Sequence, residues 1–426
     1  MDNMKLNHVL SSKQIPADAV QAFILSLIQP VSAEHVPVDR CLNRILARDI
    51  VPRANIPACP LSAMDGFAVV SEGLMTASKR QPVIVKVIDN IRAGDVPGKS
   101  IGPGTAARIM TGAALPGGAD SVVPFENTSE RLYTEGLGPD EIAVFKPVAV
   151  HENVRREGSD IEYGKVVLAQ GTQLRPQDMG MLVSVGKTSV PVYRIPRVAV
   201  LPTGNEVMEA ETPLSFGKIW SSNPYVISGL VQRYGAEPLR LGIARDSKKL
   251  LTFKINQALA LNVDLVLTCA GTSNGDFDMI QETFQTMCHE KFWKAEIKPG
   301  KTMAFGMIDG VCVMGLPGNP GALIIAFELF ARGVILKLAG QNHWDKVLIK
   351  ATLKHDFYDK QRAHLIPAVL SLCDGYPEVE ALGHAVNDQR RPEKLSTLVQ
   401  TNAFLDVPRD VTFISAGSRV NVWPLD

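Results

Sequence analysis

The chain has 426 residues, of which 46% are hydrophobic and 21% charged, a composition typical of a folded protein and too apolar for a disordered one. Its 44 basic residues balance its 44 acidic residues and only 6% of residues are aromatic, which argues against nucleic-acid binding through a basic surface or stacked bases. At about 150 residues per domain, this length predicts two to four domains.

Neither the cysteines nor the apolar segments indicate an extracellular or membrane protein. Six cysteines are dispersed without a C-x-x-C pair, which fits a reducing cytoplasm better than a zinc framework or a disulfide scaffold. The N-terminus lacks the apolar core of a signal peptide, and the most apolar stretch, 321–340, carries Glu328, Arg332 and Lys337. We therefore expect a soluble cytoplasmic protein that does not bind membranes.

The first half of the chain predicts a helical region and a β region. The first fifty residues are predicted to be helical, because apolar residues recur at helical spacing from Val20 to Ile28 and Pro30 ends the run. Residues 51–150 contain short β-like runs between Gly/Pro turns, which predicts a mostly β domain. Residues 151–192 are charged and then weakly helical, and we expect them to pack with the N-terminal helices. Strands of the β region are predicted at 83–88, 106–110, 121–125 and 141–148.

From residue 193 the pattern becomes regular. Strands alternate with helices of about 12 residues, which is typical of parallel βαβ units and a doubly wound sheet. Two further strands flank a Lys-Pro-Gly-Lys turn, and 342–426 return to a β pattern. The predicted strands are 197–201, 239–244, 263–269 and 311–316, and the predicted helices are 223–234, 247–261, 277–288 and one from 321.

Three acidic residues follow strands of this predicted parallel sheet. The carboxyl ends of parallel strands meet at one rim, so Glu206, Asp246 and Asp278 are expected there together. Each alone is explained equally well as a helix cap or a surface acid. Three acids beside anion-binding loops suggest a site that holds a divalent cation through oxygen ligands.

Two loops at the same rim have the composition of anion sites. Glycines let a backbone approach a ligand closely, and a following helix N-terminus offers unpaired N–H groups to an anion. A capped βα turn and a rigid proline turn remain the simpler explanations. The candidate ligand-binding residues are Gly271, Thr272, Ser273 and Gly275 in one loop, and Pro317, Gly318, Asn319 and Pro320 in the other.

Lysines surround the Pro-Gly turn. In a strand Lys294 and Lys298 project from the same face, and Lys301 follows the turn. They either protect an exposed sheet edge or neutralise phosphate or another oxyanion. Lysines, a cation and helix N-termini together favour phosphoryl or nucleotidyl chemistry, whereas no P-loop, dinucleotide-binding fingerprint or nucleophilic triad is present.

Six motifs, met in order along essentially the whole chain, resemble the signature blocks of the molybdopterin molybdenumtransferase family, the MoeA family that also contains the gephyrin E domain. In the β region, structural roles explain Asp65 and Thr111 about as well as functional ones, and for Asp160 in the charged bend 155–160 a surface loop is the favoured explanation. The resemblance adds a functional explanation for all three. The blocks are SAMDGFA (62–68), RIMTGA (108–113), RREGSDI (155–161), TGxE (203–206), KPGK (298–301) and LPGNP (316–320).

The resemblance implies an elongated homodimer of four-domain subunits, with multidomain α/β plus β architecture. The implied domains are a helical linker or dimerisation domain (1–50 with 151–192), a mostly β insertion domain (51–150), a MogA/MoaB-like molybdopterin-binding α/β domain with a central doubly wound parallel sheet (193–341) and a C-terminal β domain (342–426).

It also implies a reaction. Adenylylated molybdopterin and molybdate, with Mg²⁺, would give the molybdenum cofactor and AMP. Partners would be a molybdopterin adenylyltransferase and the molybdoenzymes, or their chaperones, that receive the cofactor. The resemblance implies that Glu206, Asp246 and Asp278 bind the metal ion. It implies that Asp65 and Thr111 face the α/β domain of the partner subunit. The positions that match the family's active site are Asp65, Thr111, Asp160, Glu206, Asp246, Asp278, Lys294, Lys298 and Lys301.

The chain departs from the family pattern in its ligand loops. Asn205 stands where an acid is usual, Ser221 where an aspartate is usual, and Gly321-Ala322 where Val-Ser is usual. The loop 270–275 reads AGTSNG in place of Gly-Gly-Val-Ser-x-Gly. A non-catalytic paralogue that binds a pterin as a scaffold is therefore the alternative to an active enzyme; an adenylyltransferase or a transferase for tungstate is a third reading.

Overall fold

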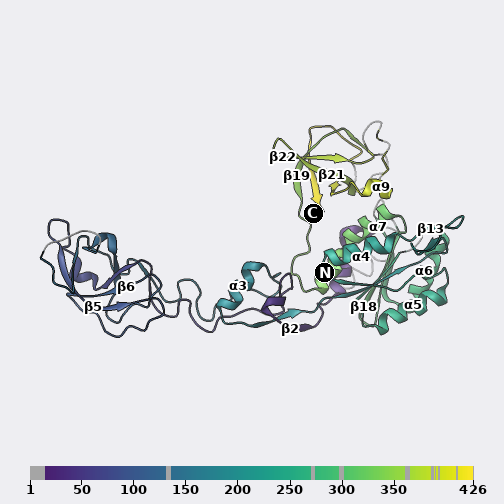
Figure 1. The fold of residues 1–426 in the computed structure, drawn as a ribbon. Coiled ribbons are helices and arrows are strands. Elements are labelled where there is room, and N and C mark those ends of the chain that lie inside the picture. Colours follow the sequence, from purple (N-terminus) through teal and green to yellow (C-terminus); the bar gives the residue numbers. More distant parts are fainter. Residues whose placement is uncertain are drawn as a thin grey trace.

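The computed structural model describes residues 15–130, 136–269, 274–296, 302–359, 365–384, 388, 390–391, 394–408 and 411–425; for 15–16, 274–279, 281, 290–296 and 302 it describes the backbone. The molecule is elongated, with the β domain that contains β5 and β6 at one end and the α/β domain at the other (Figure 1). None of the described helices is long and apolar enough to cross a bilayer.

The N-terminal region contains less helix than expected. Helix α2 (Ala17–Leu27) forms as predicted, but its Val20 and Ile24 pack into the core of the α/β domain. Residues 33–37 instead form β2, which pairs antiparallel with β10 (Ser189–Tyr193), because alternating residues such as Val190 and Val192 turn into a small core. The other elements here are β1 (Ile15–Pro16), β2 (Ala33–Pro37), η1 (Val38–Arg40), β9 (Val154–Arg155) and α3 (Pro176–Ser184).

The mostly β domain is built on a five-stranded sheet of order β7-β4-β6-β5-β8. The four predicted strands are present, and β4, which the sequence pattern did not reveal, lies between β6 and β7. Gly66 begins β4, and a Cβ there would lie 2.1 Å from the carbonyl oxygen of Val123, so only glycine fits. The elements are β3 (Leu61–Ser62), β4 (Gly66–Val69), η2 (Ser71–Leu74), β5 (Val83–Ile91), β6 (Thr105–Ile109), β7 (Ser121–Pro124), η3 (Phe125–Asn127) and β8 (Glu141–Val144).

The α/β domain contains a seven-stranded sheet of order β1-β16-β17-β18-β15-β11-β14. The predicted parallel, doubly wound arrangement holds for β18, β15, β11 and β14, whereas β17 runs antiparallel to both of its neighbours. The mixed edge arises because only Asp309 and Gly310 join β17 to β18, and so short a connection reverses the chain. Besides β1, the strands of this sheet are β11 (Arg197–Pro202), β14 (Glu237–Arg240), β15 (Leu265–Cys269), β16 (His289–Glu296), β17 (Thr302–Ile308) and β18 (Val311–Leu316). Two further strands, β12 (Val207–Met208) and β13 (Ile219–Trp220), form a separate two-stranded sheet.

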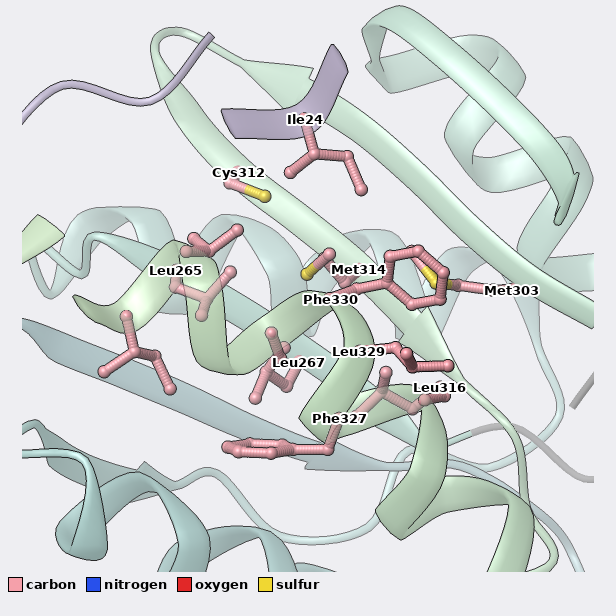
Figure 2. Close-up of a cluster of buried hydrophobic side chains, with 14 of the residues drawn as sticks. Ile24, Leu265, Leu267, Met303, Cys312, Met314, Leu316, Phe327, Leu329 and Phe330 are labelled. Carbon is pink, nitrogen blue, oxygen red and sulfur yellow. The ribbon is translucent and has the colours of Figure 1, made fainter. Parts of the chain in front are cut away.

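Helices cover both faces of this sheet because its strands are apolar on both faces. Along β11, Val198 and Val200 face one core, while Ala199 and Leu201 face the other. Figure 2 shows the first core, where Ile24 and Phe330 lie over the strands. The helices are α4 (Asn223–Arg233), α5 (Lys248–Ala260), α6 (Asn274–Met287), α7 (Pro320–Ala326), the π-helical segment η4 (Phe327–Ala331) and α8 (Arg332–Leu338).

The C-terminal domain is a closed barrel of order β19-β22-β21-β23-β25. Phe404 and Trp423 from this barrel belong to the core cluster of the α/β domain, so the two domains share buried apolar surface. Its elements are β19 (Ile349–Leu353), β20 (Phe357–Tyr358), β21 (Leu365–Cys373), β22 (Tyr376–Ala381), α9 (Leu395–Leu398), β23 (Ala403–Asp406), β24 (Phe413–Ile414) and β25 (Arg419–Pro424).

Candidate active site

The register of the parallel strands brings the candidate loops to one level. Pro202 pairs with Cys269, and Cys269 pairs with Leu316, so the last residues of β11, β15 and β18 lie side by side. The loops that follow therefore leave the sheet at the same rim, as the sequence predicted. This rim is where open α/β sheets bind ligands.

The loop after β11 is held against its neighbours by Thr203 and Gly204. The Thr203 hydroxyl donates to the carbonyl oxygen of Cys269 at 2.8 Å, and the Gly204 N–H donates to that of Ala244 at 3.2 Å. Gly204 has a φ of +134°, and a Cβ there would lie 2.6 Å from a carboxylate oxygen of Glu206. Glycine at 204 is thus favoured by the backbone conformation, and its lack of a side chain leaves room for the Glu206 carboxylate.

Asp246 is held at the rim by Asn205. The Asn205 N–H donates to Oδ2 of Asp246 at 2.9 Å, and the Asp246 N–H donates to Oδ1 of Asn205 at 3.3 Å. The other carboxylate oxygen, Oδ1 of Asp246, is buried and has no hydrogen-bond partner among the described residues. A buried carboxylate oxygen without a partner is costly, and a bound cation would satisfy it. Asp246 therefore fits the predicted role of a metal ligand.

A cavity of about 250 Å³ opens beside these loops. On its wall the Asn223 side-chain N–H₂ donates to the carbonyl oxygen of Gly318 at 2.7 Å and so links α4 to the LPGNP loop. Glu206, Gly318, Asn319 and Pro320 are the predicted site residues that line it. Its full described lining is Pro202, Thr203, Glu206, Val207, Ile219, Trp220, Ser221, Ser222, Asn223, Cys269, Gly318, Asn319 and Pro320.

The LPGNP loop begins a helix, as its prolines predict, but two of the N–H groups at that helix start are already bonded. Oδ1 of Asn319 accepts hydrogen bonds from the N–H groups of Gly321 and Ala322, at 3.0 and 3.2 Å. Asn319 is therefore the N-cap of α7. An anion at this helix N-terminus would compete with the cap for those donors.

Several predicted site residues lie outside the part of the chain that can be described. Gly271, Thr272, Ser273, Lys298 and Lys301 fall outside the described residues. For Gly275, Asp278 and Lys294 the backbone alone is described. Gly275 and Asp278 lie at the start of α6, which begins at Asn274 and not at the predicted 277. Lys294 of β16 pairs with Thr302 of β17. Among the side chains described, no group of three or more His, Cys, Asp or Glu residues is placed to hold a metal ion, and the side chain of Asp278 is not among them.

The β domain brings Asp65 and Thr111 together. Oδ1 of Asp65 accepts hydrogen bonds from both the N–H and the hydroxyl of Thr111, each at 2.8 Å. Asp65 precedes β4 and Thr111 follows β6, which are adjacent strands. Asp160 lies in the nearby bend after β9, where its N–H donates to the carbonyl oxygen of Ile56 at 3.1 Å. All three residues are exposed.

Within one chain, the Asp65–Thr111 pair and the rim are far apart. Figure 1 places the β domain at the end of the molecule opposite the α/β domain, with the β2 and α3 region between them. The two groups of predicted site residues thus do not form one site inside a single subunit.

Sequence reasoning missed two groups of residues. Trp220 was not singled out, and Ser221 and Asn223 were noted only as part of a departing motif, yet all three line the cavity. Glu328 was used only to exclude a membrane span, yet it is 1% exposed and both of its carboxylate oxygens accept from the Tyr234 hydroxyl at 2.9 Å. A charged residue inside an apolar helix was the signal that such a buried cluster exists.

The chain matches three family models along most of its length. Residues 15–186 match the MoeA N-terminal region (domains I and II), 199–337 match a probable molybdopterin-binding domain, and 350–425 match the MoeA C-terminal region (domain IV).

Curated relatives and solved structures agree with these matches. The molybdopterin molybdenumtransferase of Staphylococcus epidermidis is 35% identical over 96% of both chains, and that of a Nostoc species is 34% identical over 90% of this chain and 86% of the relative. Two crystal structures of a molybdopterin biosynthesis MoeA protein from Pyrococcus horikoshii, 28% identical, superpose with TM-scores of 0.82 and 0.78 over 97% of this chain and 100% of theirs. This chain therefore belongs to the molybdopterin molybdenumtransferase family and is a transferase of molybdenum cofactor biosynthesis.

Proposed function

We propose that the chain transfers molybdenum from molybdate to adenylylated molybdopterin, with release of AMP. The observation that carries this proposal is the rim itself. In the domain that matches a molybdopterin-binding model, three strands in register place Glu206, the LPGNP loop and a cavity side by side, and Asp246 adjoins them through Asn205. Such an arrangement suits chemistry that depends on positioning and on charge stabilisation.

Magnesium fits the residues at this rim. Asp246 would offer its unpartnered Oδ1, and Glu206, whose carboxylate lies against Gly204, would offer a second oxygen; Asp278, which follows β15 in the chain, is the third ligand of the proposal. When bound, the cation would stabilise negative charge on the phosphoanhydride that is cleaved. Lys294, Lys298 and Lys301 would bind molybdate or phosphate on the hairpin beside β18.

A second subunit completes the site in this proposal. Asp65 and Thr111 lie too far from the rim of their own chain, and the family resemblance assigns them to the partner subunit's rim. The hydrogen bonds from Thr111 fix the Asp65 carboxylate in one orientation, which suits a group that must meet another surface. Asp160, which lies in the bend after β9, would line the same cleft.

The substrate and product identify the partner proteins by class. An enzyme that adenylylates molybdopterin would supply the substrate, and molybdoenzymes or their chaperones would take the product. We place this work in the cytoplasm, where the six cysteines, all of which are unpaired in the structure, would stay reduced.

The test is AMP release from purified protein supplied with adenylylated molybdopterin, molybdate and Mg²⁺. We expect release that requires both molybdate and Mg²⁺. Asp278→Ala should abolish release while the fold stays intact, because an oxygen ligand of the cation is lost. Tight binding of the adenylylated substrate without AMP release would instead support a non-catalytic, scaffolding paralogue.

A further inference from the structure

One wall of the cavity is a flap, which we define as residues 205–222. Its two short strands, β12 and β13, pair in parallel, with Val207 opposite Ile219 and Met208 opposite Trp220. Two hydrogen bonds hold the flap together at its base: the Ile219 N–H donates to the carbonyl oxygen of Glu206 at 2.9 Å, and the Lys218 ammonium donates to that of Asn205 at 2.7 Å. The Asn205 N–H, which donates to Oδ2 of Asp246, ties the flap to the rim. The flap is therefore an ordered part of the cavity wall.

Trp220 presents an aromatic ring on this wall. Its indole N–H donates to the carbonyl oxygen of Thr212 at 3.0 Å, which fixes the ring on the flap. The side chain lines the cavity, yet the residue is 50% exposed. A large aromatic ring whose N–H is satisfied and whose surface remains exposed at a cavity is suited to cover a planar ligand.

Asn223 lines the same cavity and has a side-chain oxygen without a partner among the described residues. The carbonyl of Gly318 can only accept a hydrogen bond, so the group of Asn223 that contacts it must be the amide nitrogen. This fixes the orientation of the amide, and Oδ1 is left buried without a partner among the described residues. A ligand with a donor N–H would satisfy that oxygen.

We propose that Trp220 and Asn223 form the subsite that recognises a fused, planar nitrogen heterocycle bearing an exocyclic amine. The indole ring covers the face of the heterocycle, and Oδ1 of Asn223 accepts a hydrogen bond from its amine. Two ring systems of the proposed substrate, the pterin and the adenine, share this chemistry. The proposal thus rests on the proposed function for its substrate, but its tests measure binding and not turnover.

The size of the cavity favours a single ring system. Its volume of about 250 Å³ is below the roughly 300–1,000 Å³ of pockets that enclose a whole drug-sized ligand. One heterocycle would therefore occupy it while the rest of the substrate extends along the rim toward Asp246.

The test compares the binding of AMP and of free pterin to the full-length protein and to Trp220 variants by calorimetry. Stacking of one ring on an aromatic side chain predicts that Trp220→Ala weakens the binding of one of the two ligands by about tenfold. Trp220→Phe should keep most of the affinity. Phe216→Ala is the matched control, because Phe216 is a fully exposed aromatic residue of the same flap that does not line the cavity.

The acceptor is tested with ligands that lack the amine. IMP has a carbonyl in place of the exocyclic amine of AMP, and lumazine has a carbonyl in place of the amine of pterin. We expect the ligand whose binding depends on Trp220 to bind at least about tenfold more tightly than its oxo analogue. In the analogue, the carbonyl oxygen and Oδ1 of Asn223 would be two acceptors facing each other. Four results would each overturn the subsite. Trp220→Ala could bind both ligands as tightly as wild type, or Phe216→Ala could lose as much affinity as Trp220→Ala. The wild type could bind the amine and the oxo analogue equally well, or it could bind neither AMP nor pterin. AMP release by the wild type in any of these cases would leave the proposed reaction standing.

Discussion

Two polar clusters in the α/β domain differ in how completely their hydrogen bonds are made. At the rim, one oxygen of Asp246 and one of Asn223 are buried without a partner among the described residues. At the junction with the C-terminal barrel, the two oxygens of Glu328 share the one hydrogen of the Tyr234 hydroxyl, and the Arg332 guanidinium lies 4.0 Å from Glu328.

The junction cluster also joins two domains. The Arg332 guanidinium lies 5.4 Å from the ring centre of Tyr234 and 5.6 Å from that of Trp423, which belongs to the barrel, and it donates to the carbonyl oxygen of Trp344 at 2.9 Å. Lys346 lies 4.6 Å from the ring centre of Trp423. Buried polar groups that are bonded stabilise a fold, whereas buried groups without a partner mark places where an ion or a ligand can bind. The two clusters should therefore respond to mutation in opposite ways.

The largest effect is expected for Asp246→Ala. Loss of a ligand to the cation should remove several kcal/mol of transition-state stabilisation, or about a thousandfold in AMP release. The melting temperature should change little, because the substitution removes one hydrogen bond, from the Asn205 N–H, and with it a buried oxygen that has no partner among the described residues. Asp140→Ala, which removes an exposed acid of the β domain, is the control. Full activity in Asp246→Ala would mean that the open oxygen has no role in the reaction.

The opposite pattern is expected at the junction. Glu328→Ala leaves the Tyr234 hydroxyl and Arg332 without their buried partner, which should lower the free energy of unfolding by about 3 kcal/mol in urea titrations. AMP release per folded molecule should stay within about twofold of wild type, since Glu328 is not at the rim. Glu237→Ala, which removes a surface acid 3.7 Å from Arg197, should cost less than about 1 kcal/mol. A large loss of activity in folded Glu328→Ala would remove the distinction between the two clusters.

The charge of Glu328 adds a pH dependence to the same cluster. Burial raises the pKa of the Glu328 carboxyl above its ordinary value of 4.5, against the opposing effects of the Tyr234 hydrogen bond and of Arg332, Arg233 and Lys346. The folded state then binds the proton more tightly than the unfolded state, so this contribution to stability falls as the pH rises above about 4.5 and through the raised pKa. Glu328→Gln, which cannot titrate, should therefore gain stability relative to wild type between pH 5 and pH 8. A constant difference across this range would contradict the raised pKa.

Mixing two inactive variants tests whether the rim acts with the β domain of a partner subunit. We expect Asp65→Ala and Asp246→Ala each to be nearly inactive alone. When the two variants are unfolded together and refolded, the mixture should regain about one quarter of wild-type AMP release. The reason is that half of the randomly paired dimers would contain both variants, and one of the two composite sites in each such dimer would be intact. The same mixture of Asp246→Ala with Glu206→Ala, two variants of one rim, is the control and should regain nothing. Equal recovery in both mixtures, or none in either, would argue against a shared site.

The smallest effect concerns the departure at Asn205. Asn205→Asp keeps an acceptor for the Asp246 N–H and adds a negative charge next to the proposed cation, so the Mg²⁺ concentration for half-maximal AMP release should fall by several fold. Asn205→Ala, which removes the acceptor, should raise it. An unchanged Mg²⁺ requirement in both variants would separate Asn205 from the metal.

The sequence alone was sufficient wherever the signal is local. The alternation of apolar strands with helices predicted the parallel part of the sheet, because residues such as Val198 and Ala199 must each find an apolar neighbour on opposite faces. It also predicted that Glu206 and the LPGNP loop follow strands, and hence that they share one rim. The strand β2 was missed, because short exposed runs such as 33–37 have no period of their own and form only when β10 is beside them.

Only the tertiary structure decided which polar atoms are bonded and which are open. Nothing in the motifs shows that Asn319 caps its own helix, that Asn223 leaves an oxygen unpaired, or that Trp220 forms a wall of the cavity. The cap is a local contact, whereas the unpaired oxygen of Asn223 depends on a contact across the 95 positions between Asn223 and Gly318. The sequence by itself therefore determined the family, the parallel part of the core and the shared rim of Glu206 and the LPGNP loop. The separation of the two groups of site residues, and the completeness of each hydrogen-bond network, followed only from the packing of distant segments.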